Sequence, residues 1–230
     1  LKQTDSNSAA FRAILTATES QINFYSNVIE NYNFFKSTIN KENFQIITDG
    51  LRKLIFVEVS LERGKDDPQR IFESLNSTGL DLSQSDLIRN FILMDLEPKE
   101  QNKVFDNIWN PIEENARDYR KQKSLVSDYI RDYLTLKNKK IPNKSKVYQE
   151  FKKLNRDKSE DAFQQDLENI KSLSVHYRKF INPQELSDYN LRKELEYISR
   201  LEINVAYPFL LQVFEDAEND VIDNKTLIDI

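Results

Sequence analysis

The stretch IFESLNSTGLDLSQSDLIRNFIL, residues 71–93, predicts two helices joined by a short turn. Gly79 supplies the left-handed residue that commonly follows a helix end, because glycine adopts positive φ at no steric cost. Ser83 suits the N-cap of the second helix, and Asp86 stands three residues later, as in a capping box. These signals for helix ends indicate that the segment belongs to a helical protein.

Helix capping does not explain why some of the polar residues occur in this stretch. Asn76 lies four residues after Phe72, on the same helix face as an aromatic ring, where a half-buried amide needs hydrogen-bond partners. In one interpretation Asn76 caps its own helix end, and in the other it holds a ligand. Arg70 and Arg89 each have a carboxylate three residues away, so the simpler interpretation of both is a surface ion pair.

The composition also predicts a mainly α protein. Glycine occurs 3 times and proline 6 times in 230 residues, too rarely for the many turns of an all-β fold. The exception is LIFVEVSL, residues 54–61, whose alternation of side chains predicts one short strand or a small residual sheet. A lone strand leaves its backbone unpaired, and the nearby candidate partner is the start around Leu1 to Thr4.

Apolar residues at helical spacing predict helices along most of the remaining chain. The helix expected over residues 41–49 follows the candidate N-cap Asn40 and stops near Gly50. The expected helices cover 20–39, 41–49, 101–115, 124–137, 146–155, 161–180, 191–201, 208–215 and the C-terminus.

Several classes of protein and site are disfavoured or excluded. A net charge of −5 argues against a dedicated nucleic-acid binder, although local basic patches remain open. The absence of cysteine excludes disulfides and thiolate metal sites and fits a cytoplasmic protein. No run of 18 apolar residues occurs, so we expect no membrane span. The sequence has one histidine, His176, which we expect to be a satisfied or solvated side chain.

The pattern F-x-x-x-N-x-x-x-x-x-L, filled by Phe72, Asn76 and Leu82, resembles the second signature of the N-terminal domain of GmrSD-type modification-dependent restriction enzymes. The segments NIWNPIEE, KVYQEFKKL and AYPFLLQVFED resemble the helical region of the same family. The resemblance implies that residues 1–96 form the C-terminal part of a ParB- and sulfiredoxin-like nucleotide-binding domain. It implies a helical connector over residues 97–230.

The family's nucleotide site is implied to combine this element with a D-G-Q-Q-R motif. The nearest segment here, DGLRK at residues 49–53, lacks both glutamines and precedes the expected strand, so we interpret it as a helix end. The implied nucleotide-binding residues are Arg70, Phe72, Asn76, Leu82 and Arg89. The HNH nuclease domain that often follows in the family needs several histidines. We therefore expect no catalytic residue or metal site in this chain, and we expect NTP and Mg²⁺ to act in a longer parent protein.

A basic loop follows the expected helix at 124–137. Its lysines are Lys137, Lys139, Lys140, Lys144 and Lys146, with no acid among them, and Arg117, Arg120, Lys121 and Lys123 come shortly before. One interpretation is a solvated loop between helices, and the other is sequence-independent contact with DNA phosphates. We expect Trp109 and the tyrosines to serve the core.

Two functions are compatible with these features. In the first, the chain is a fragment of an NTP-dependent restriction or anti-phage DNA endonuclease, contributes half of a nucleotide site, and is inactive alone. We expect its partners to be the missing parts of its parent chain and DNA, with a second copy of the chain as a further option, and we expect no membrane association. In the alternative, it is a helical protein-interaction scaffold. Asn76 discriminates between them, since an open polar site around it favours the first and a capped helix end favours the second.

Overall fold

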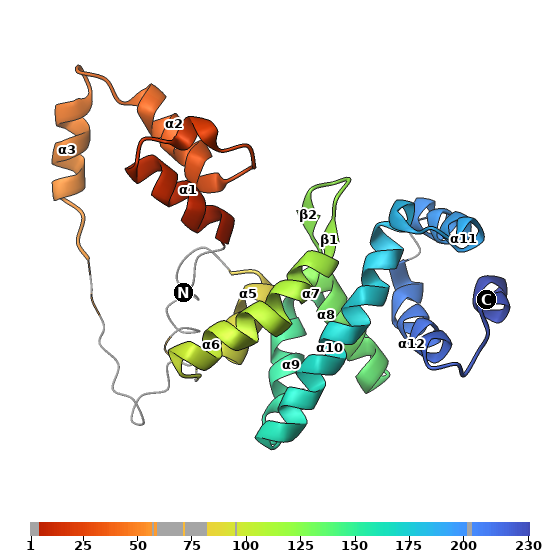
Figure 1. Ribbon diagram of the computed structural model, residues 1–230. Helices are drawn as coiled ribbons and strands as arrows, with labels where there is room; N and C mark the ends of the chain where they lie inside the picture. The colour runs from red at the N-terminus through yellow and green to blue at the C-terminus, as the bar shows by residue number, and fades with distance from the viewer. Residues whose placement is uncertain (1–4, 57, 59–70, 72–81, 95, 202–203) are drawn as a thin grey trace. The chain divides into compact units, whose positions relative to one another are not determined.

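The computed structural model describes residues 5–56, 58, 71, 82–94, 96–201 and 204–230 (Figure 1). The described residues are mainly helical, which confirms the predicted class. The chain divides into two compact units, unit 1 over Leu1–Ser60 and unit 2 over Leu61–Ile230. The functional assignment of residues 1–96 and 97–230 remains a prediction.

Unit 1 contains α1 (Asp5–Leu15), a 3-10 helix (Glu19–Gln21), α2 (Asn27–Thr38) and α3 (Phe44–Arg52). Helices α1 and α2 pack together, and the buried Ser26 caps α2 by accepting a hydrogen bond from the Val28 N–H at 3.2 Å.

Two boundaries in unit 1 differ from the prediction. The helix expected from residue 20 begins at Asn27, after the Ser26 cap. The helix expected over 41–49 runs from Phe44 to Arg52 and continues past Gly50. The side-chain oxygen of Asn40 accepts hydrogen bonds from the backbone N–H groups of Glu42 and Asn43, so Asn40 forms a turn that delays the helix.

The small sheet lies away from the predicted segment. Residues 54–56 and 58 have no strand structure, and the rest of 54–61 lies outside the described residues, as does the candidate partner at 1–4. The described sheet consists of β1 (Arg117–Asp118) paired antiparallel with β2 (Lys123–Ser124). The Asp118 carboxylate accepts the N–H groups of Arg120 and Lys121 at 3.0 Å each, which stabilises the turn between the two strands. This turn places β2 directly beside β1 as its pairing partner.

Unit 2 holds most of the described helices, and the predicted ones are confirmed to within a few residues. It contains α5 (Gln84–Leu93), α6 (Pro98–Val104), a π-helical segment (Phe105–Trp109), α7 (Asn110–Asn115), β1, β2, α8 (Val126–Asn138), a 3-10 helix (Lys144–Lys146), α9 (Val147–Asn155), α10 (Glu160–Ile181), a 3-10 helix (Pro183–Glu185), α11 (Tyr189–Arg200), a 3-10 helix (Asn204–Ala206), α12 (Tyr207–Glu218) and α13 (Asn224–Asp229).

The core of unit 2 is built around α10, the long helix that passes α7, α8 and α12 in Figure 1. Tyr129 on α8 is fully buried and donates a hydrogen bond to the Ile170 carbonyl of α10. Tyr177 on α10 contacts the rings of Tyr129 and Tyr207, at centroid distances of 4.9 and 5.7 Å. Trp109 is 1% exposed, so its expected place in the core is confirmed. Helix α8 is therefore held by α10 and α12, and it also packs against α9 and α5.

Candidate functional site

The second half of the opening stretch forms the N-cap and the whole of α5. The Ser83 hydroxyl accepts a hydrogen bond from the Asp86 N–H at 3.1 Å, which confirms the predicted cap. Leu82 is half-buried immediately before this cap. The predicted nucleotide-site residues Arg70, Phe72 and Asn76 lie outside the described residues, and their role remains a prediction.

Arg89 on α5 lies between two carboxylates. Its guanidinium donates to Asp86 Oδ1 at 2.8 Å, the predicted ion pair, and to Glu113 Oε1 at 3.2 Å. The same Glu113 oxygen accepts the indole N–H of Trp109 at 2.7 Å. Arg89 thus links α5 to α7. Its proposed contact with a nucleotide remains a prediction.

We expect Glu113→Ala to lower the free energy of unfolding by about 2 kcal/mol, because it leaves the buried Trp109 N–H without an acceptor and removes one carboxylate from Arg89. Glu113→Gln keeps a side-chain oxygen for Trp109 and serves as the matched control, with a cost of about 1 kcal/mol or less. Urea denaturation followed by the fluorescence of Trp109, the one tryptophan of the chain, measures both variants. An alanine variant as stable as the glutamine variant would show that the network adds nothing.

The basic loop folds back along α8. Lys139 ends the helix with φ 54°, and the Arg131 Nε–H of α8 donates to the Pro142 carbonyl at 2.8 Å. Lys144 lies 3.8 Å from Asp128 of α8. Lys139, Lys140, Lys144 and Lys146 are exposed, and Lys137 lies over the Tyr133 ring at 5.5 Å from its centroid. The loop is anchored, and most of its ammonium groups face solvent.

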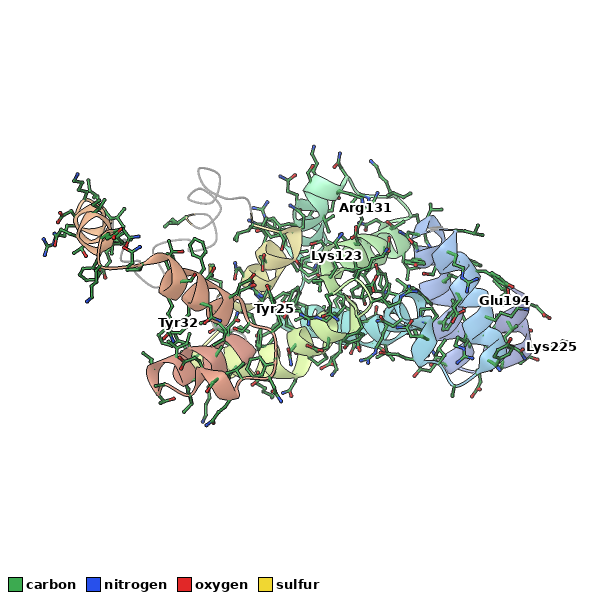
Figure 2. All side chains as sticks on the ribbon, turned by 90° about the horizontal axis from the view of Figure 1, so that it is seen from above. Tyr25, Tyr32, Lys123, Arg131, Glu194 and Lys225 are labelled. Carbon is green, nitrogen blue, oxygen red and sulfur yellow. The ribbon has the colours of Figure 1, made fainter. Side chains whose placement is uncertain are left out.

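The folded-back loop lines one side of an open pocket of about 470 Å³, whose other lining residues come from the β1–β2 hairpin, α8, α10, α12, Ser199 of α11 and the 3-10 helix Asn204–Ala206. Its cationic lining residues are Arg120, Lys121, Lys123, Arg131 and Lys144, which we call the basic rim. Figure 2 shows Lys123 and Arg131 on the same part of unit 2, with Lys225 at the far end of the C-terminal helices. Two basic segments that are separate in the sequence therefore meet at one site.

The carboxylates around the pocket offset only part of this charge. Asp118 accepts backbone N–H groups of its own turn, and Asp128 pairs with Lys144. Burial and the neighbouring Asp128 charge raise the pKa of Asp132 to about 7, so Asp132 is only partly ionised at neutral pH. The pocket mouth thus carries an excess of positive charge, which suits an anionic ligand.

The floor of the pocket is polar. It contains Asp132, which is 8% exposed, and the tyrosines Tyr177 and Tyr207, which are 2% and 5% exposed. Burial first, and then the charge of Asp132, raise the pKa of both tyrosine hydroxyls, so the three groups lie within electrostatic reach of one another. No hydrogen bond joins the Asp132 carboxyl or either hydroxyl to another described residue.

His176 belongs to a different environment. It is 1% exposed, and its Nε2 lies 3.1 Å from Glu218 Oε2. Burial, followed by the nearby Lys179 charge, lowers its pKa to about 4, so the ring is neutral at pH 7 and donates to the carboxylate. The expectation of a satisfied histidine is confirmed. Among the residues that the structure describes, no group of His, Cys, Asp and Glu could hold a metal ion, and no helix is long and apolar enough to cross a membrane.

The sequence interpretation included the lysines of the rim and missed the floor. Arg131, Asp132, Tyr177 and Tyr207 come from three helices, and their convergence depends on how those helices pack. One local signal was available. Asp132 lies in a segment of α8 that is otherwise buried, next to Tyr133, which is an unusual position for a carboxylate.

The comparisons with known proteins concern the first part of the chain. Residues 1–93 match the family model of the GmrSD restriction endonuclease, N-terminal domain. The resemblance to the GmrSD N-terminal domain is confirmed over these residues, and the resemblance of the segments after residue 93 to the family's helical region remains a prediction. No curated protein and no solved structure gives a significant match. The GmrSD match includes the Phe72, Asn76 and Leu82 pattern and ends with α5 at Leu93, so the basic rim lies beyond it.

Proposed function

We propose that this chain is the nucleotide-site and connector portion of a GmrSD-type, NTP-dependent DNA endonuclease that acts in the cytoplasm. The observation that supports it is the match of residues 1–93 to the N-terminal domain of that restriction endonuclease family. In this proposal residues 1–96 complete a nucleotide site, and the helical region after them carries the contact with DNA.

The proposed nucleotide half-site consists of Arg70, Phe72, Asn76, Leu82 and Arg89. The amide of Asn76 orients the nucleotide or its attacking water. An amide alone cannot neutralise the charge that develops during phosphoryl transfer, so the D-G-Q-Q-R motif of the parent and Mg²⁺ supply the rest.

The DNA contact uses the basic rim and the exposed lysines of the loop. The rim gathers cations from the β1–β2 turn, α8 and the loop around one opening, and Lys139, Lys140 and Lys146 extend it along the loop. Exposed ammonium and guanidinium groups bind phosphates by releasing counterions, a contact that does not depend on base sequence. Because the net charge of the chain is −5, this proposed contact depends on the local cluster of cations and not on the overall charge.

We expect this chain alone to release no phosphate from ATP or GTP, and the parent with its upstream motif to release it. Asn76→Ala in the parent should lower the rate about tenfold, the effect of losing one positioning hydrogen bond of ~1.4 kcal/mol. Its effect on folding should be only about 1 kcal/mol, as for a helix-end residue.

Phosphate release with Mg²⁺, measured for the chain, the parent and the Asn76→Ala parent, tests the nucleotide half-site. Turnover by the isolated chain, or a fully active mutant parent, would leave the helical scaffold as the better account. The scaffold would also be favoured by Asn76 capping its own helix under packed apolar side chains.

A further inference from the structure

The floor of the pocket carries polar groups that the DNA contact does not use. Asp132 is more than nine-tenths buried, lines the pocket, and makes no hydrogen bond or ion pair with a described residue. A buried carboxyl without a partner is costly, and such groups are concentrated at sites that bind ligands. The hydroxyls of Tyr177 and Tyr207 share this situation beside it.

The pocket combines three kinds of surface in one volume. Its mouth carries the basic rim, its walls include the apolar side chains of Leu125, Ile141, Ile181 and Val205, and its floor carries one carboxyl and two hydroxyls. A volume of about 470 Å³ falls within the range of small-molecule sites and exceeds what an isolated phosphate or an amino acid fills. The matching ligand has an anionic end, a flat or apolar body, and a hydrogen-bond donor at its other end.

We propose that this pocket binds one nucleotide, with its phosphate at the basic rim and the amino-bearing edge of its base on Asp132, Tyr177 and Tyr207. The proposal rests on the proposed DNA contact, because the same rim would hold the phosphates of a strand. A carboxyl accepts from exocyclic amino groups of nucleobases, and the two hydroxyls can donate to or accept from the remaining atoms of that edge. The nucleotide is either free or an unpaired unit of a strand that enters the pocket base first.

Calorimetric titration of the full chain with dGMP, dAMP, dCMP, dTMP and inorganic phosphate tests the free-nucleotide source. At least one of the three amino-bearing nucleotides should bind about tenfold more tightly than dTMP, because thymine has no exocyclic amino group and offers only its ring N3–H as a donor on that edge. Inorganic phosphate should bind more weakly still. Phosphate that binds as tightly as the nucleotides would reduce the site to an anion-binding rim for free ligands and exclude a free nucleotide as the source.

A second arm tests the strand source with two duplexes that differ by one unpaired nucleotide. The duplex with the unpaired nucleotide should bind more tightly than the fully paired one if the pocket accepts a base from a strand. A response in either arm supports the proposal and identifies the source. Equal binding of the two duplexes, together with free nucleotides that bind no more tightly than inorganic phosphate, would refute it.

Substitutions of Asp132 test whether the floor of the pocket contributes to nucleotide binding. Asp132→Leu should lower the affinity for the responding nucleotide or duplex at least about tenfold, whereas Asp132→Asn keeps an acceptor and should stay within about threefold of the wild type. Asp157→Leu, at an exposed turn between α9 and α10, is the matched control and should change nothing. Wild-type affinity in Asp132→Leu, with unfolding monitored by Trp109 fluorescence to establish the fold, would overturn the assignment.

These experiments distinguish a failure of the nucleotide pocket from a failure of the proposed DNA contact. Binding of paired duplex that depends on the loop lysines, without any effect of Asp132, would retain the DNA contact and refute the nucleotide pocket. Nucleotide binding that depends on Asp132, without any binding of paired duplex, would retain the pocket and refute the DNA contact.

Discussion

Asp132→Asn should raise the free energy of unfolding at pH 8 by about 3 kcal/mol, since it removes a buried carboxylate whose charge is disfavoured by desolvation. Burial raises the pKa of Asp132 to about 7, above the usual range of an aspartate. The folded protein therefore holds this proton more tightly than the unfolded chain. The contribution of Asp132 to stability is complete below about pH 4 and is lost as the pH rises through about 7.

The measurement is urea denaturation of wild type and variant at pH 4.5 and pH 8, followed by Trp109 fluorescence. The difference between the two proteins should be small at pH 4.5 and close to its full value at pH 8. The pKa of His176 is lowered to about 4, so its contribution to the free energy of unfolding is lost as the pH falls. Both proteins contain His176, so this contribution cancels in the difference between them. A variant that is less stable than wild type at pH 8 would mean that Asp132 has a partner that stabilises its charge.

Replacing Lys139, Lys140 and Lys144 together by alanine should weaken duplex DNA binding on the order of 100-fold at 100 mM salt, because each lost phosphate contact forfeits about one released counterion. The loss should be the same for unrelated DNA sequences, since phosphates carry no sequence information. Fluorescence anisotropy with two labelled duplexes of different sequence measures it.

The matched control replaces three exposed lysines away from the pocket, Lys99, Lys103 and Lys225, and changes the net charge equally. It should lower affinity by a few-fold at most, since only long-range attraction is lost. An equal loss in both triple variants would attribute binding to overall charge and not to the loop. A loss for only one DNA sequence would point to base contacts.

The helices of unit 2 were predictable because their signal is local. Apolar residues at three- and four-residue spacing specify a buried stripe, and caps such as Ser83 mark the ends. The position of the sheet was not predictable in this way. Alternation over residues 54–61 satisfies one requirement of a strand, whereas the pairing of Arg117–Asp118 with Lys123–Ser124 depends on a turn closed by Asp118.

The candidate site was predictable only in its charged part. Lysines clustered in one loop are visible in any sequence, and the loop at 137–146 does contribute to the rim through Lys144. The floor could not be derived, because Asp132, Tyr177 and Tyr207 lie on different helices and meet only through the packing of α8, α10 and α12. The ion pair of Arg89 with Asp86 was predictable because both residues lie on one helix. Its second ion pair, with Glu113, joins α5 to α7 and therefore was not predictable from local spacing.

The salt dependence of DNA binding tests the proposed DNA contact most directly. The dissociation constant of a labelled duplex is measured between 50 and 200 mM salt for the wild type, the loop triple variant and the matched control. The plot of log affinity against log salt should be linear for the wild type, and its slope should shrink by about 3 in the loop variant, at roughly 0.9 for each phosphate contact. The control should keep the wild-type slope. An unchanged slope in the loop variant would contradict the account and leave the loop as a solvated connection between helices.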